Sequence, residues 1–157
     1  MLVHIHRYEK LWLIIGTSIL FVFLTILAVQ TIAMGLAPPS HVETIDPEKV
    51  RETAPFDEPG IEQIGEKEYV VTMIAMTFGF DPGEIEIPVG STVHFHMTSP
   101  DVTHAIQVPN TNINAMIMPG YISKISHTFN KKGEFLMLCN EYCGTGHHFM
   151  MGTIIVN

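Results

Sequence analysis

Hydrophobic and polar residues are distributed very unevenly along this chain of 157 residues. Residues 11–34 contain no charged side chain, and most of them are aliphatic or aromatic. A helix of this length would extend about 36 Å, which is enough to cross a hydrocarbon core of about 30 Å. The pattern therefore predicts a membrane-spanning helix. A cleaved signal peptide is the alternative, but its apolar region usually has only about 7–15 residues.

The second half of the chain has the pattern of short β-strands. Val93, Phe95 and Met97 alternate with two histidines and a threonine, which is the period of a half-buried strand. Turn sequences rich in proline, glycine and aspartate separate this run from similar ones. The predicted strands are residues 69–77, 84–89, 92–98, 104–108, 121–129, 134–138 and 153–156. Short strands at this spacing predict a mainly β domain, either a sandwich or a small barrel.

The region between the apolar run and the first strand has a different composition. Residues 37–65 carry five prolines among mostly polar residues, which is typical of an extended connector. We therefore divide the chain into three parts. Residues 1–36 form the N-terminal end and the membrane helix, residues 37–65 a linker, and residues 66–157 the β domain.

Charge is also unevenly placed. Arg7 and Lys10 precede the apolar run, whereas six Lys and Arg stand against fifteen Asp and Glu from residue 37 onward, a net charge of −9. The positive-inside rule predicts a cytoplasmic N-terminus and a β domain on the outer side of the cell membrane. An acidic surface repels nucleic acid and could attract a basic protein, although simple solubility would explain it equally well.

The densest chemistry lies near the C-terminus. Cys139, Cys143, His147 and Met150 follow one another at steps of four, four and three residues, and the chain has no other cysteine. Thiolate, imidazole and thioether groups form a ligand set that suits copper. The four residues fall between two predicted strands, so one loop would carry them all. The alternative is a disulfide, which two cysteines outside the cytoplasm commonly form.

A second imidazole comes from upstream in the chain. His104 follows a strand and the Ser99-Pro-Asp-Val-Thr corner, and it is the natural partner for a pair of copper ions. A mononuclear blue-copper site needs only one thiolate, so the second cysteine favours two ions. Asp101 could stabilise the turn or orient His104. Spacing alone does not exclude His148 as a ligand.

These motifs resemble the CuA site of cytochrome c oxidase subunit II. The Cys-x3-Cys-x3-His-x2-Met pattern carries the resemblance, together with the corner that ends at His104. A single membrane helix is similar to the B-type branch of the haem–copper oxidases. The resemblance covers nearly the whole chain and includes Tyr8-Glu-Lys-Leu-Trp12, Phe78-Gly-Phe80, Thr111-Asn-Ile-Asn114 and Met118-Pro-Gly120.

The resemblance implies a cupredoxin-like Greek-key fold that holds two copper ions. Cys139 and Cys143 would bridge both ions, and the other ligands would be His104, His147, Met150 and the backbone carbonyl of Glu141. The chain would accept electrons from cytochrome c and pass them to haem in subunit I, which also holds CuB. Oxygen would be reduced to water in subunit I, so we expect no oxygen-reducing site here. A small accessory subunit is a further expected partner.

Two other regions receive roles from the same resemblance. Met76, Phe78 and Phe80 occupy the place where relatives carry an aromatic run near the point of electron input, and core packing is the simpler alternative. Glu9 stands where B-type relatives have a glutamate at the mouth of a proton path into subunit I. An ordinary interfacial charge beside Arg7 and Lys10 is the alternative for Glu9.

Two other functions use similar residues. A membrane-anchored copper chaperone can carry Cys-x3-Cys and a distant histidine, but such proteins resemble thioredoxin and need helices between their strands. A stand-alone cupredoxin electron carrier would hold one copper ion per chain, and its second cysteine would be spare or part of a disulfide.

Overall fold

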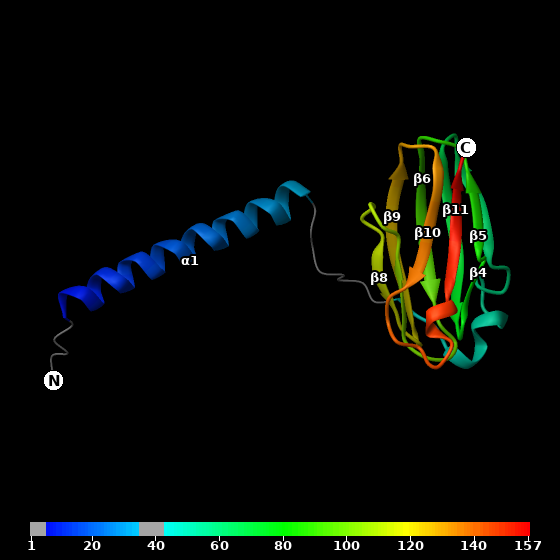
Figure 1. Ribbon diagram of the computed structural model, residues 1–157, viewed down its shortest axis with the longest axis horizontal. Helices are drawn as coiled ribbons and strands as arrows, with labels where there is room; N and C mark the ends of the chain where they lie inside the picture. The colour runs from blue at the N-terminus through cyan, green and yellow to red at the C-terminus, as the bar shows by residue number, and fades with distance from the viewer. Residues whose placement is uncertain (1–5, 35–42) are drawn as a thin grey trace. The chain divides into compact units, whose positions relative to one another are not determined.

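The computed structural model describes residues 6–34 and 43–157 (Figure 1). The chain forms two compact units, Met1–His41 and Val42–Asn157. The first unit contains the helix and the second contains the strands. Residues 1–5 and 35–42, which belong to the predicted N-terminal end and linker, lie outside the described residues.

A single long helix, α1 (Arg7–Met34), forms the described part of the first unit. It is long and apolar enough to cross a membrane. It begins four residues before the apolar run, and at its start the carboxylate of Glu9 accepts a hydrogen bond of 3.0 Å from the backbone N–H of His6. This bond satisfies a donor that the first turn of a helix would otherwise leave free.

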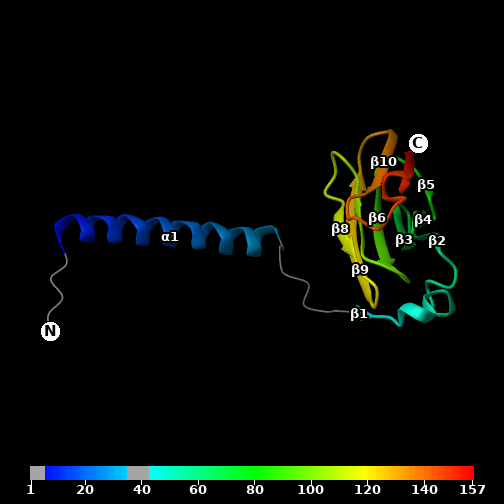
Figure 2. The same cartoon turned by 60° about the horizontal axis from the view of Figure 1, so that its bottom comes forward.

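The second unit consists of two β-sheets and two 3-10 helices (Figures 1 and 2). One sheet has the strand order β1-β9-β6-β3-β2, with β4 paired to β3, and the other has the order β5-β11-β10-β7-β8. Neighbouring strands are antiparallel, except that β3 pairs with β6 and β5 with β11 in parallel. The elements are β1 (Glu43–Thr44), η1 (Pro47–Glu52), β2 (Gly60–Gly65), β3 (Glu68–Met76), β4 (Gly79–Asp81), β5 (Glu84–Ile87), β6 (Ser91–Thr98), β7 (His104–Gln107), β8 (Asn114–Ile117), β9 (Tyr121–Phe129), β10 (Gly133–Cys139), η2 (His147–Phe149) and β11 (Met151–Val156).

Residues that alternate along the strands form the core between the sheets. Val93, Phe95 and Met97 on β6 are completely buried, and they pack in one cluster with Ile106 of β7 and Ile154 of β11. The intervening histidines lie on the other face of β6 and stay partly exposed. The alternation along residues 92–98 thus separates a core face from an outer face, and the prediction of a mainly β domain is confirmed.

Part of the segment assigned to a linker packs on the β domain. Residues 43–65 contain β1, η1 and β2, and Val50 and Phe56 are buried against Ile74 of β3. The turn into η1 is capped by Asp46, whose side chain accepts from the backbone N–H of Glu48 at 3.1 Å. Isolated apolar residues among prolines show no period, so the sequence pattern gave no sign that they would be buried.

Replacing Phe56 with alanine tests this packing. Because the ring is fully buried, Phe56→Ala should lower the free energy of unfolding by about 3–5 kcal/mol. Urea unfolding of a soluble fragment that spans Val42–Asn157 would measure the change. Ile64→Ala is the control, because Ile64 is 53% exposed and its loss should cost no more than about 0.5 kcal/mol. Equal small losses in both variants would contradict the packing.

Candidate metal centre

The candidate site lies at the end of the sandwich opposite the C-terminus, where η2 is seen in Figure 1. Two elements of one sheet bring its residues together. Cys139 is the last residue of β10, and it pairs with Ile106 of β7, two residues after His104. Strand pairing therefore places two parts of the sequence, 35 residues apart, beside each other.

The loop between β10 and β11 is closed by backbone hydrogen bonds. The N–H of Cys139 donates to the carbonyl of Met150 at 3.2 Å, which joins the two ends of the loop. The N–H of His147 donates to Gly144 at 3.1 Å, and the N–H of Met150 donates to His147 at 3.1 Å. The loop is thus fixed at its base and at η2.

The sulfur and nitrogen atoms of the predicted ligands converge at this loop. Cys139 Sγ lies 4.0 Å from His104 Nδ1 and 3.2 Å from the carbonyl oxygen of Glu141. Cys143 Sγ lies 3.5 Å from His147 Nδ1 and 3.6 Å from Met150 Sδ. The ligand atoms of His104, Cys139 and Cys143 lie within 4.8 Å of one another.

These separations suit a metal centre. Two ligands on one tetrahedral metal, with bonds of about 2.0–2.3 Å, lie roughly 3.3–3.8 Å apart. Both cysteines are free thiols, so the disulfide alternative is not what the structure shows. The thiols, His104 and Met150 are all at least 92% buried, since Cys139 has the largest exposed fraction of 8%. The donor chemistry and the spacing fit copper.

Asp101 orients the buried imidazole of His104. Its Oδ1 atom lies 2.8 Å from His104 Nε2, which leaves Nδ1 to face the thiols. Burial favours a higher pKa for Asp101, but hydrogen bonds from the Thr77 backbone, the His104 side chain and the Val102 backbone outweigh it, and the pKa falls well below its ordinary range. Asp101 also shapes the turn, because Oδ1 accepts from the N–H of Val102 at 2.7 Å. Of the roles considered for Asp101, orientation of His104 and stabilisation of the turn are both present.

Other residues singled out from the sequence fall in different places. Phe80 is buried in the core, and Met76 packs on the cluster that contains Phe56. Phe78 alone of the three predicted electron-input residues is well exposed, at 42%. The ring centroids of His148 and Phe149 are 3.9 Å apart, whereas the neighbouring His147 turns toward Cys143.

Thr77 is a contributor that the sequence did not reveal. Its backbone N–H and its hydroxyl donate to Asp101 Oδ2 at 2.7 and 2.8 Å. The two residues are 24 positions apart, and threonine after a strand is too common to attract notice. No signal in the sequence of a single chain would have found this contact.

Comparison with known proteins places this site in a family. The profile described as "Cytochrome C oxidase subunit II, periplasmic domain" matches residues 70–157. The chain is 41% identical over 153 residues to cytochrome c oxidase subunit 2 of Thermus thermophilus, and the match covers 95% of this chain and 91% of the relative. The chain belongs to the cytochrome c oxidase subunit II family.

Solved structures agree with this assignment. A chain of a haem–copper terminal oxidase dimer superposes with a TM-score of 0.79 and 32% identity, and the match covers 96% of this chain and all of that one. The periplasmic domain of subunit II from Bradyrhizobium japonicum shares the fold, with a TM-score of 0.54, 21% identity and coverage of 60% and 88%. The chain is therefore a copper-binding subunit of a terminal oxidase that assembles with subunit I, and the one membrane-length helix among the described residues fits a single-pass membrane protein.

The metal-free chain should lose stability in alkali. Burial raises the pKa of the Cys143 thiol from 9.0 to about 11, and the charge on Cys139 adds to the rise. Unfolded chains would release this proton from pH 9 upward while folded chains keep it, so folding stability should fall between pH 9 and about 11. Urea midpoints measured across this range under reducing conditions would test the effect.

Cys143→Ser serves as the control for this pH dependence. A serine hydroxyl does not titrate in the same window, so the decline should be shallower in the variant. Identical declines in the two proteins would show that Cys143 does not contribute.

Proposed function

We propose that the chain accepts single electrons from cytochrome c at a dinuclear copper centre and delivers them to subunit I. The observation that carries the proposal is the convergence of two thiols, two imidazoles, a thioether and a carbonyl within one loop and one strand end. A mononuclear site would leave one of the two buried thiols without a role. A pair of copper ions held by both thiolates would accept and donate one electron at a time. Because the two ions would share that electron, the bond lengths at each ion would change little.

The residues of this chain hold the ligands in place. Cys139 and Cys143 would bridge the ions, His104 and His147 would each bind one, and Met150 and the Glu141 carbonyl would be weaker ligands. The pairing of β10 with both β7 and β11 fixes the loop, so the donor atoms need not move when the redox state changes. Burial excludes water from the thiols and His104, which strengthens the electrostatic effect of nearby groups on the redox potential.

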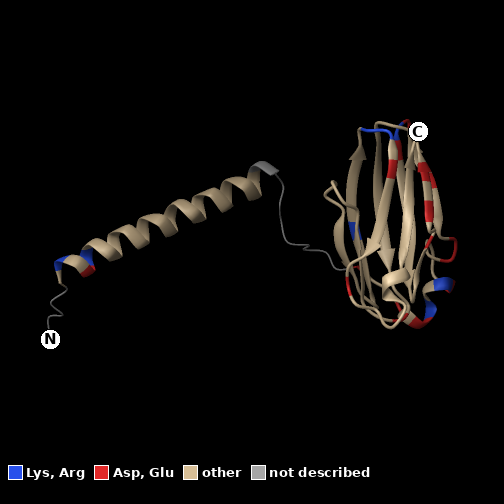
Figure 3. Ribbon diagram, viewed as in Figure 1, with Lys and Arg blue, Asp and Glu red and all other residues tan. Residues whose placement is uncertain are grey.

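Exposed apolar side chains next to the ligands support docking of a protein donor at this end of the domain. Tyr142 and Phe149 flank the ligand residues of the loop and are 73% and 71% exposed, and Phe78 lies against the same loop. Acidic residues outnumber basic ones across the β domain (Figure 3). A donor with an apolar contact patch and basic surroundings, such as a cytochrome c, would match these properties.

The orientation in the membrane follows from the charges at the start of α1. Arg7 and Lys10 lie in its first turn, at the end of α1 that carries blue ribbon in Figure 3, and the positive-inside rule predicts that this end lies in the cytoplasm. The copper domain would then face the outer side, where a soluble donor can reach it. The small accessory subunit stays a prediction.

The copper-chaperone alternative fits the fold poorly. Thioredoxin-like proteins have α-helices between their strands, whereas the described residues from 60 to 157 contain no helix other than the short turn η2. A stand-alone cupredoxin shares the β fold and is distinguished by the number of copper ions.

The copper content of the chain and of two histidine variants tests the centre. The purified chain should hold two copper ions and show electron paramagnetic resonance hyperfine structure from two equivalent nuclei. His147→Ala should abolish this signal, whereas His148→Ala is the matched control and should preserve it, because His148 faces Phe149. Cys139→Ser should also abolish it. A working blue centre with one ion in Cys139→Ser would instead identify a mononuclear cupredoxin.

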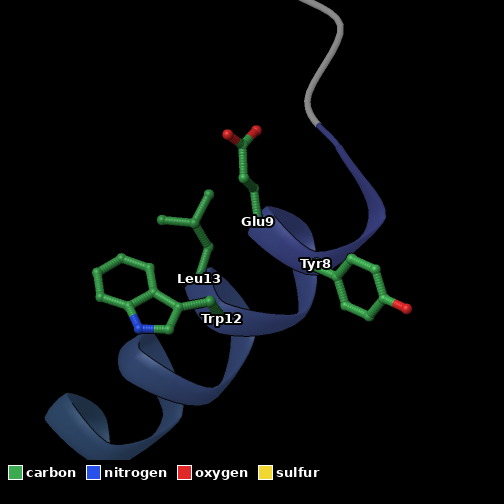
Figure 4. A pocket seen from close by; sticks show the side chains of 4 residues that line it. All are labelled: Tyr8, Glu9, Trp12 and Leu13. Carbon is green, nitrogen blue, oxygen red and sulfur yellow. The ribbon is translucent and has the colours of Figure 1, made fainter.

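We also propose that Glu9 takes part in proton uptake at the cytoplasmic end of α1. The side chains of Tyr8, Glu9, Trp12 and Leu13 border a hollow on the helix surface (Figure 4). Figure 4 shows the Glu9 carboxylate extending outward from the helix, and its Oε2 atom accepts from the backbone N–H of His6. In the assembled oxidase, this carboxylate would exchange protons with a group or water of subunit I.

Glu9→Gln should slow turnover of the assembled oxidase, by up to about 10²-fold if proton delivery becomes limiting. Its copper content should not change, because Glu9 belongs to the helix unit and not to the copper domain. Lys10→Gln is the control for loss of an interfacial charge. Full turnover in Glu9→Gln would remove the proton-uptake role.

A further inference from the structure

The tip between β3 and β4 contacts both halves of the candidate copper centre. This tip, residues Thr77 and Phe78, joins Met76 to Gly79, which pair with each other across the hairpin. Neither residue belongs to the ligand set. Each nevertheless touches a different segment that carries ligands, and each does so by a different kind of contact.

Thr77 acts on the segment that carries His104. Its N–H and its hydroxyl both donate to Asp101 Oδ2, and the other oxygen of the same carboxylate lies 2.8 Å from His104 Nε2. Two donors on one oxygen hold the carboxylate plane in place. Because His104 is fully buried, the orientation of its ring depends on that carboxylate.

Phe78 acts on the loop that carries Cys143 and His147. Its ring lies so close to Gly146 that a side chain there would displace it, and it packs tightly against Gly144. A Cβ atom added at Gly146 would lie 2.5 Å from Phe78 Cδ2, and one added at Gly144 would lie 3.1 Å from Cε1. Gly144 also has a φ of +127°, a conformation that favours glycine. The ring therefore lies directly on the loop backbone.

The contact with the glycines extends to a ligand. The carbonyl of Gly144 accepts from the N–H of His147 at 3.1 Å, and the carbonyl of Gly146 accepts from the N–H of Phe149 at 2.9 Å. The first bond fixes the turn that leads into η2, and the second opens η2, which begins at His147 and ends with the bond from Met150 N–H to the His147 carbonyl. A shift of the glycine backbone would therefore move the imidazole of His147 relative to Cys143.

The tip has a firm base. The side chains of Ala75 and Phe80, just outside the tip, are buried in the core and pair across the hairpin. Arg51 of η1 donates to Asp81 at 3.0 Å and lies 3.6 Å from the sulfur of Met76. The strands on both sides of the tip are thus tied to the segment at residues 43–58.

We propose that the Thr77–Phe78 tip positions both histidine ligands, Thr77 acting on His104 through Asp101 and Phe78 acting on His147 through Gly144 and Gly146. The inference rests on the proposed dinuclear copper function and assigns that site a positioning element. Because a single rigid hairpin sets both imidazoles, their separation stays constant when an electron arrives or leaves. The sequence suggested electron input for Phe78, and this role is additional.

The test compares variants of the full chain, purified in detergent and loaded with copper. Paramagnetically shifted proton resonances of the two histidine rings, assigned by nuclear Overhauser contacts, are recorded for Thr77→Val and Phe78→Ala. Thr77→Val should shift the resonances of His104 and leave those of His147 in place. Phe78→Ala should shift the His147 resonances and leave those of His104. Copper affinity should fall in both variants, toward the low end of the roughly 10–100-fold loss that follows removal of partners of metal ligands.

Conservative variants and controls separate positioning from general destabilisation. Thr77→Ser keeps the hydroxyl and Phe78→Tyr keeps the ring, so both should restore the original resonances. Thr92→Val removes a hydroxyl that bonds only Thr128 in the described contacts, at 2.9 Å, and Phe149→Ala removes an exposed ring from the same loop. Neither control should selectively shift the resonances of His104 or of His147 as Thr77→Val and Phe78→Ala do.

A double-mutant cycle between Phe78 and Gly146 tests the contact between the ring and the loop backbone. Gly146→Ala should displace the ring and shift the His147 resonances as Phe78→Ala does. In the Phe78→Ala background the same change should add little, because the space is then free. Additive effects, or shifts of both histidines in every variant, would overturn the positioning role.

Measurements on the unaltered chain distinguish failure of the proposed copper function from failure of the positioning role alone. If it holds a single copper ion or none, the proposed function fails and the positioning role fails with it. If it holds two ions with the expected hyperfine structure while the variants leave both sets of resonances unchanged, only the positioning role is wrong.

Discussion

The structure of the candidate centre depends on strand pairing on both sides of β10. This strand pairs with β11, so the loop between them must return to its starting point, and the bond from Cys139 to Met150 closes it. The same strand pairs with β7, which begins at His104. Without these ladders the chain would have six donor groups spread over 47 residues, from 104 to 150, and no site.

Burial then determines the protonation of the thiols and their tendency to bind a metal ion. His104 has the Asp101 carboxylate as a partner, whereas a thiolate that is closed to water has few groups to stabilise its charge except a metal ion. The raised pKa of Cys143 reflects this cost in the metal-free chain. A bound cation would reverse it, because a metal-bound thiolate is deprotonated outright. The same burial that disfavours the empty charged site would therefore favour the loaded one.

The contacts around the ligands come from parts of the chain distant in sequence. Asp101 holds His104, Thr77 holds Asp101, and Phe78 rests on two glycines of the ligand loop. Arg51 ties the base of that hairpin to a segment of the predicted linker. The stability of the centre is thus shared between the sandwich and residues 43–58, which the composition alone assigned to a connector.

The sequence by itself determined the helix and the β class, and it predicted the candidate ligand residues. An uncharged apolar run of this length is stable only in lipid or in a protein core. The alternation along residues 92–98 separates a buried face from an exposed one. The close spacing of Cys139, Cys143, His147 and Met150 means that one loop can carry all four. Each of these signals is local. Tertiary structure alone decided the burial of Phe56, the contact of Thr77 with Asp101, and the fit of Phe78 over Gly146. Those contacts join residues 18 to 68 positions apart, and no local pattern encodes which distant side chain will fill a space that only the folded backbone creates.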